Sequence, residues 1–404
     1  MRPARVCRYH AAMAHPDSTA PPELSPEARA LLEEHPVFDA HVDSIQRALD
    51  LGHDLGERGP GHLDLVRGRE GGLGAVVLVC WVDPAYIAAE GGAAARTRGL
   101  LREVHRLARR HPERVHLTGN GRELDAARAA GRVAAIPGIE GGHSIEESLE
   151  LLEWFSERGV RVLTLVWNNH LSWIRSCQEG AGAGVPEGLS GFGRDVVRTM
   201  NRLGMVVDLS HAGRRSFYDA LEATDRPVIA SHSGCHALHD HPRNLDDGQL
   251  RALALNGGVV GIVFHPGFLD AGARAEDARV YGSEDYRALE GANETELFLR
   301  QSEHLTRAAA PLPAERLVEH VLHAVEVAGP EHVGLGSDYD GILRGPRWLE
   351  DASCYGTLAE LLLQRGLAAD EVRGILGGNM ERVFARATGP GTRAWEAKVT
   401  PLLD

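Results

Sequence analysis

The chain has 404 residues, of which 43% are hydrophobic and 25% are charged. This composition supplies enough apolar side chains for one large core and excludes a chain that is disordered throughout. The formal net charge is −14 and Lys and Arg form no dense run, which argues against nucleic acid because a phosphate backbone attracts a basic surface. The cysteines predict neither a disulfide framework nor a Cys-x-x-Cys metal site, since they are few, odd in number and widely spaced: Cys7, Cys80, Cys177, Cys235 and Cys354.

The N-terminal stretch is rich in Ala, Pro and His without a periodic pattern. We therefore predict a disordered tail at 1–24 and a single domain at 25–404. Residues 11–22 are interrupted by His, Pro, Asp and Ser, which leaves no apolar segment for a signal peptide or a membrane span. We expect a cytoplasmic enzyme that does not bind membranes.

Eight apolar runs alternate with stretches of helical spacing. The first predicted helix has Ser25 as its N-cap and ends at about Glu34, and the first strand then starts at Pro36. Further helices are predicted at 91–110, after a capping box that begins at Ser144, and across 317–328. The remaining strands are predicted at 73–82, 132–139, 161–166, 204–209, 227–231, 257–263 and 332–337. Eight strands alternating with helices predict an α/β fold, a (β/α)8 TIM-type barrel.

Several of these runs end in a carboxylate or an imidazole. The first strand is followed by His41 and Asp43, and later runs end in Glu140, His211, His232 and Asp338. The carboxyl ends of all barrel strands meet at one face, where this fold carries its active site. Imidazole nitrogen and carboxylate oxygen are ligands that a divalent zinc ion accepts. Together these side chains predict a site for two metal ions that share one oxygen.

The motifs resemble those of the membrane dipeptidase (renal dipeptidase) family of zinc peptidases, which are amidohydrolase-like barrels. The resemblance covers residues 36–384 and is carried by His41-x-Asp43, residues 138–144, 207–211, 231–233, 336–341 and 377–379, and the pair Arg243-Asn244. It implies a zinc-dependent dipeptidase with two Zn²⁺ per chain, in which His41 and Asp43 hold one ion, His211 and His232 hold the other, and Glu140 bridges them.

The resemblance also assigns roles to two other residues. Asp338 would be the catalytic acid and base, which takes a proton from the attacking water and gives it to the leaving amine. Arg243 would bind the free carboxylate of the substrate through its planar fork. A hydroxide shared by two metal ions would attack the peptide carbonyl, because each ion lowers the pKa of bound water from about 15.7 toward about 7. The partners implied are a small dipeptide-like substrate and a second copy in a homodimer.

One position departs from the family. Characterised dipeptidases place a histidine after the fourth strand to stabilise the tetrahedral intermediate, whereas Trp167 stands there in this chain. An indole N–H donates a hydrogen bond but carries no charge. His170 is a candidate replacement in substrate binding, and Asn168 or Asn169 are candidate donors to an oxyanion.

Two long connections are candidates for function. The glycine-rich segment 178–193 could form a flexible lid, and the acidic segment 268–296 could contact the substrate or another subunit. The other histidines are interpreted as support, packing or surface residues: His143, His236, His239, His241, His320 and His323.

Two alternatives to a dipeptidase remain open from the sequence. Trp167 and the glycine-rich segment are compatible with another metal-dependent hydrolase on the same barrel, such as a lactonase, a deaminase or an enzyme that processes a modified peptide. A non-catalytic binding protein is disfavoured, because the expected ligands and Asp338 are all present.

Overall fold

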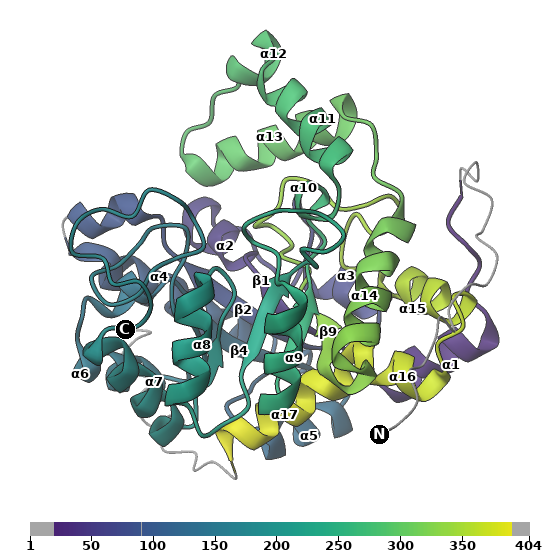
Figure 1. Ribbon diagram of the computed structural model, residues 1–404. Coiled ribbons are helices and arrows are strands. Elements are labelled where there is room, and N and C mark those ends of the chain that lie inside the picture. The colour runs from purple at the N-terminus through teal and green to yellow at the C-terminus, as the bar shows by residue number, and fades with distance from the viewer. Residues whose placement is uncertain (1–19, 90, 390–404) are drawn as a thin grey trace.

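The computed structural model describes residues 20–89 and 91–389 (Figure 1). Most of the tail predicted at 1–24 and the last residues of the predicted domain lie outside this description. Residues 20–24 contain no helix or strand, and Leu24 packs against the core. In the described residues, no helix combines the length and apolar character needed to cross a membrane.

The predicted barrel is confirmed. Eight parallel strands close into a ring in the order β1-β2-β4-β5-β6-β7-β8-β9, with β9 paired back to β1. Their bounds are β1 Val37–Val42, β2 Leu73–Trp81, β4 Val133–Glu140, β5 Val162–Thr164, β6 Val206–Asp208, β7 Ile229–Ser233, β8 Val259–Ile262 and β9 Val333–Leu335. The strands read as continuous apolar runs because the barrel interior and the surrounding helices bury both of their faces.

The sequence did not predict one further strand. β3 (Val115–Leu117) pairs with the first residues of β4, while β5 pairs with the last residues of β4. β3 therefore extends the sheet below the start of β5 and contributes no residue to the face that carries the ligands.

Helices surround the barrel and close its lower end (Figure 1). Met380, Val383 and Phe384 of α17 join Phe38 and Ile136 of the strands in a core inside the barrel. The α-helices of the described residues are α1 Pro26–Glu34, α2 Ile45–Leu51, α3 Leu65–Glu70, α4 Gly92–Arg110, α5 Gly121–Ala129, α6 Leu149–Ser156, α7 Gly191–Leu203, α8 Arg214–Ala223, α9 Asp247–Asn256, α10 Pro266–Leu269, α11 Ala271–Tyr281, α12 Glu284–Arg287, α13 Glu294–Ala308, α14 Ala314–Ala328, α15 Tyr355–Gln364, α16 Ala369–Arg373 and α17 Asn379–Thr388. The shorter turns are η1 Pro84–Ala88, η2 Gly142–Ile145, η3 Pro330–His332 and the π-helical η4 Gly374–Gly378.

The structure tests the two N-caps predicted from the sequence, Ser25 and Ser144. Ser25 caps α1 through its side chain, as predicted. The capping box predicted at Ser144 is wrong, because Ser144 lies inside η2 and the next helix has Ser148 as its N-cap. Glu146 instead accepts a hydrogen bond from the backbone N–H of Ala94 in the first turn of α4, 3.0 Å away. The carboxylate therefore caps a different helix, one that lies far away in the sequence.

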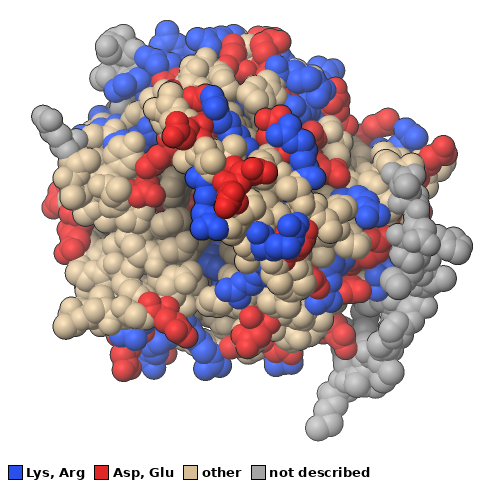
Figure 2. All heavy atoms as spheres, turned by 90° about the horizontal axis from the view of Figure 1, so that it is seen from above, with Lys and Arg blue, Asp and Glu red and all other residues tan. Residues whose placement is uncertain are grey.

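A helical insertion, α10 to α13, rises above the carboxyl ends of the strands (Figure 1). It contains the whole acidic segment 268–296. The start of α13 is attached to the end of α2, since the Thr295 hydroxyl donates to Asp50, 2.5 Å away, and the Asn293 amide donates to the Asp50 carbonyl at 3.3 Å. Seen from above, this side of the molecule has acidic and basic side chains intermixed (Figure 2).

Candidate metal centre and active site

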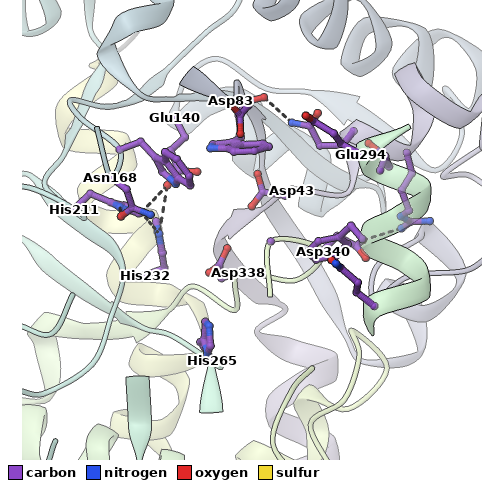
Figure 3. A pocket seen from close by; sticks show the side chains of 18 of the residues that line it. Asp43, Asp83, Glu140, Asn168, His211, His232, His265, Glu294, Asp338 and Asp340 are labelled. Atoms are coloured by element: carbon purple, nitrogen blue, oxygen red, sulfur yellow. Dashed lines mark hydrogen bonds and ion pairs between the residues drawn. The ribbon is translucent and has the colours of Figure 1, made fainter. Parts of the chain in front are cut away.

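The five predicted metal ligands meet at the carboxyl ends of β1, β4, β6 and β7. Glu140 lies at their centre: its Oε1 is 3.0 Å from His211 Nε2 and 3.4 Å from His232 Nε2, and its Oε2 is 3.5 Å from His41 Nε2. Asp43 Oδ2 lies 3.5 Å from His41 Nε2 on the opposite side. Figure 3 shows Glu140, His211 and His232 on one wall of the cavity and Asp43 across from them. All five side chains are at most 6% exposed.

The unpaired atoms of this cluster fit a cation. His41 Nε2, both oxygens of Asp43 and Glu140 Oε1 are buried and have no hydrogen-bond partner. Such groups are costly to bury unless a ligand or an ion satisfies them. The atoms form two overlapping groups that could each hold an ion, one made by His41, Asp43 and Glu140 and the other by Glu140, His211 and His232. The donor set of imidazoles and carboxylates suits a divalent metal.

The charges of the cluster perturb the pKa values of its members. Burial raises the pKa of Asp43 to about 6, against the opposing effect of His41. Burial alone would lower the pKa of His41, but the Glu140 and Asp43 carboxylates raise it well above its usual value. Burial and the Arg243 guanidinium lower the pKa of His211 to about 3. The carboxylates therefore attract positive charge at His41, while His211 is held neutral, as a metal ligand must be.

The ring nitrogens that point away from the centre are also fixed. His41 Nδ1 and His232 Nδ1 lie 3.1 Å and 2.8 Å from the Ser231 hydroxyl. His211 Nδ1 lies 3.0 Å from Asn168 Oδ1. These contacts orient each ring so that Nε2 faces Glu140.

Asp338 lies beside the ligands at the end of β9, as the sequence predicts. It lines the cavity next to Asp43 and has a positive φ of 63°. A Cβ at Gly341 would lie 2.2 Å from Asp338 Oδ1 and 2.6 Å from Asp43 Oδ2, so both carboxylates depend on a glycine there. Burial raises the pKa of Asp338 well above its usual value, and the Asp43 and Glu140 carboxylates act in the same direction while His41 opposes them.

Asp340 has a different environment, although it also lines the cavity. It forms an ion pair with the buried Arg47, with an N–O distance of 2.9 Å, and accepts from the backbone N–H of His62 at 2.8 Å. Its carboxylate is satisfied by the protein, in contrast to that of Asp43. Asp340 therefore supports the fold beneath the cavity.

Arg243 reaches the cavity from the loop after β7. Its Nη2 donates to the His232 carbonyl at 3.0 Å, and its buried Nε has no partner. The other cavity-lining arginines are engaged by carboxylates, Arg47 by Asp340 and Arg96 by Asp50. Arg243 is thus the one arginine of the cavity lining without an ion pair in the described residues. It is available to an anionic group of a ligand.

Trp167 and His170, which both follow β5, have different surroundings. Trp167 lines the cavity, 5.2 Å from the Trp81 ring and 6.2 Å from the His211 ring between centroids. His170 is absent from the cavity lining; its Nδ1 accepts from the Ser176 N–H at 3.2 Å and its Nε2 faces the Glu179 carbonyl. The side chain of His170 thus braces the loop, and its position does not fit the predicted substrate contact.

The cavity is larger than the metal cluster and has a volume of about 470 Å³. None of its lining residues comes from the glycine-rich segment 178–193, whereas α13 of the insertion contributes five. Lining residues that the sequence did not single out are Gln46, Arg47, Trp81, Asp83, Tyr86, Arg96, His265, Leu297, Phe298 and Gln301. The sequence had indicated this wall only through the segment 268–296, a candidate for substrate contacts, of which Phe268, Glu294 and Thr295 line the cavity.

The histidines that the sequence analysis interpreted as support, packing or surface residues lie outside this lining, as expected. His143 Nε2 donates to the Val82 carbonyl at 2.8 Å. His320 joins the Cys235 N–H and the Leu269 carbonyl, each at 2.9 Å. His323 pairs with Asp247 and the exposed His236 pairs with Asp240.

Comparisons with known proteins agree with this arrangement. The family described as membrane dipeptidase (peptidase family M19) matches residues 25–393. An uncharacterized dipeptidase of Schizosaccharomyces pombe is 33% identical over 334 residues, which are 80% of this chain and 72% of that protein. Dipeptidase 3 of Rattus norvegicus is 32% identical over 376 residues, 90% of this chain and 67% of that protein.

A solved structure has the same fold and a related sequence. The metallopeptidase of Rhodobacter sphaeroides, liganded with a phosphinate mimic of the dipeptide L-Ala-D-Ala, superposes with a TM-score of 0.72 and 25% identity. The match covers 87% of this chain and 99% of that one.

Proposed function

The chain belongs to the membrane dipeptidase family, peptidase family M19, and is a metal-dependent dipeptidase; we propose that it uses two zinc ions to hydrolyse dipeptides with a free C-terminal carboxylate. The observation that carries the proposal is the convergence of unpaired ligand atoms on Glu140 from both sides. His41 and Asp43 would hold one ion and His211 and His232 the other. Bound there, two zinc ions would supply a hydroxide at neutral pH and polarise the peptide carbonyl.

The protein side chains position the substrate around this centre. Arg243 would bind the C-terminal carboxylate with its unpaired guanidinium edge, in a buried setting where a charge-assisted hydrogen bond is strong. A dipeptide held in this way would place its scissile carbonyl near Glu140 and extend its amino-terminal residue past Asp43 toward Trp81 and Tyr86, which line the same cavity.

Asp338 would move the proton during hydrolysis. Its carboxylate lies beside Asp43, one of the proposed ligands, and would therefore be close to a water held between the two ions. It would accept a proton from that water and donate it to the nitrogen of the scissile bond as the amine leaves. These proton transfers do not involve Trp167, whose departure from the family pattern bears on the stabilisation of the tetrahedral intermediate and not on the movement of the proton.

The proposal is tested with a panel of L-L and L-D dipeptides, each assayed with chelated protein and after addition of Zn²⁺. We expect cleavage that chelation abolishes and Zn²⁺ restores, and slower cleavage when the C-terminal carboxylate is amidated. Cleavage of a lactone or a modified amide, with no dipeptide turned over, would favour another hydrolase on the same barrel. A homodimer is part of the proposal and is tested by light scattering.

A further inference from the structure

The Ser231 hydroxyl lies beneath the metal centre and contacts ligands from both of its halves. Its Oγ is 3.1 Å from His41 Nδ1 and 2.8 Å from His232 Nδ1, and it donates to Asp208 Oδ2 at 2.6 Å. Ser231 and Asp208 are both fully buried. One oxygen atom therefore touches a histidine of each proposed metal site and a carboxylate below them.

Asp208 is already satisfied by protein donors. Its Oδ1 accepts from the backbone N–H groups of Ser231 and Ser210, at 2.8 Å and 3.1 Å, and its Oδ2 accepts from the hydroxyls of Thr164 and Ser231. Asp208 lies close enough to His41 and His232 for the three to hold an ion. Because its oxygens are occupied, in contrast to those of Asp43, Asp208 acts as an acceptor beneath the site and not as a ligand.

The hydrogen bonds of Asp208 determine which atoms around Ser231 carry a proton. A serine hydroxyl has one proton to donate and two lone pairs that accept. The proton is used by Asp208, so both lone pairs are available to N–H donors. His41 and His232 then each donate from Nδ1, which leaves the lone pair of each Nε2 directed to the centre, where His232 Nε2 lies 3.0 Å from His211 Nε2.

We propose that Ser231 is a positioning residue that couples the two metal sites, because its single hydroxyl sets the tautomer and the orientation of one histidine in each. The inference rests on the proposed two-ion centre. Asn168 offers the contrast, since its Oδ1 contacts a single proposed ligand, His211 Nδ1, at 3.0 Å, and also accepts from the Gln178 amide at 3.0 Å. Loss of Ser231 weakens both sites together, whereas loss of Asn168 weakens one.

The size of the effect follows from the groups that would be left unpaired. Ser231→Ala leaves two buried N–H groups without an acceptor and Asp208 without one of its donors. Loss of such an outer partner of a metal-ligating histidine typically weakens metal binding about 10- to 100-fold. We expect a loss of that size at both sites in Ser231→Ala and at the His211 site alone in Asn168→Ala.

The test is a Zn²⁺ competition titration with a chromophoric chelator on the full chain. Ser233→Ala is the matched control: it makes the same change two residues along β7, at a buried hydroxyl that has no partner. The expected result is two weakened sites in Ser231→Ala, one in Asn168→Ala and none in Ser233→Ala. Two sites of wild-type affinity in Ser231→Ala would overturn the inference alone, whereas a wild-type chain that binds no metal would overturn the proposed two-ion centre.

A second measurement uses the wild-type protein and does not depend on how the variants fold. Long-range ¹H–¹⁵N NMR of the zinc-loaded, histidine-labelled chain reports which ring nitrogen carries the proton. We expect a proton on Nδ1 of both His41 and His232. Zinc bound through Nδ1 of either residue would contradict the role given to Ser231.

Discussion

The floor and the outer wall of the cavity are built differently. The ligands of the floor lie at the carboxyl ends of barrel strands, and all five are at most 6% exposed. The outer wall comes from α2, η1, α4 and α13, and its side chains Tyr86, Leu297 and Phe298 are only partly buried. A few hydrogen bonds to Asp50 of α2 hold the parts of this wall together: Arg96 of α4 donates to it, and so do Asn293 and Thr295 at the start of α13. The barrel therefore fixes the chemistry, while the insertion shapes the space available to the substrate.

The largest effect should come from the floor, at Asp338. We expect Asp338→Asn to lower kcat by about 10²- to 10⁴-fold, because the amide cannot move the proton between water and amine. Metal content, measured by elemental analysis, should stay that of the wild type, since Asp338 is not one of the proposed ligands. A variant that keeps its metal and most of its kcat would remove Asp338 from the reaction.

A smaller effect is expected at Arg243, between the floor and the wall. Arg243→Ala should lower kcat/KM for dipeptides by roughly 10- to 100-fold, because a hydrogen bond to a charged group contributes about 1.5–3 kcal/mol. The matched control is the same pair of proteins with dipeptide amides, which lack the carboxylate and should show little difference. An equal loss on both kinds of substrate would mean that Arg243 supports the loop and does not bind the carboxylate.

The stability of the protein should depend on pH because of His320, which lies where the barrel meets the insertion. Burial lowers the pKa of His320 to about 4, below the ordinary value of 6.5. The unfolded chain therefore takes up the proton first as the pH falls, and the contribution of His320 to stability is complete above about pH 6.5 and is lost on the way to about pH 4. It amounts to about 3 kcal/mol.

Urea unfolding of chelated protein at several pH values checks this, with His320→Gln as the comparison. Titrations at the metal site are common to both proteins and cancel. We expect the free energy of unfolding to fall more steeply with acidification in the wild type than in the variant. Parallel curves would show that His320 does not carry the dependence.

The smallest effect is expected at the contact of the wall with α2. Thr295→Ala removes the hydrogen bond to Asp50, for which about 0.5–1.5 kcal/mol is typical. We expect KM for dipeptides with a bulky N-terminal side chain to rise by a few-fold and kcat to be unchanged. Thr295→Ser keeps the hydroxyl and serves as the control, and a fall in kcat in Thr295→Ala would show that wall and floor are not separable.

The same division explains what the sequence could predict. His41, Glu140 and His232 lie at the carboxyl ends of apolar strands, and the barrel brings these ends together, so spacing and ligand chemistry were sufficient to predict that the three residues meet. Of the wall, the sequence indicated only the segment 268–296. The rest was not predicted, because its contacts depend on how α13 folds back over α2.

The residues that contact the ligand histidines from beneath the metal centre were also not predicted from the sequence. The contact between Ser231 and His41 joins residues 190 positions apart, and a buried serine in a strand gives no signal of its own. Asn168 was considered as a donor to an oxyanion, which its Nδ2 could still be, since the residue lines the cavity; the contact of its Oδ1 with His211 was not predicted. Ser144 was interpreted as a helix cap because its spacing to Glu147 fits a capping box, but both Glu146 and Glu147 have a positive φ that ends η2.

The most direct test of the whole account is the metal content of the purified chain, measured by elemental analysis before and after chelation and paired with dipeptide hydrolysis at each stage. We predict about two zinc ions per chain, loss of hydrolysis when they are removed, and recovery on addition of Zn²⁺. Full hydrolysis by metal-free protein, or a chain that takes up no divalent metal, would contradict the assignment of the unpaired atoms around Glu140 as metal ligands.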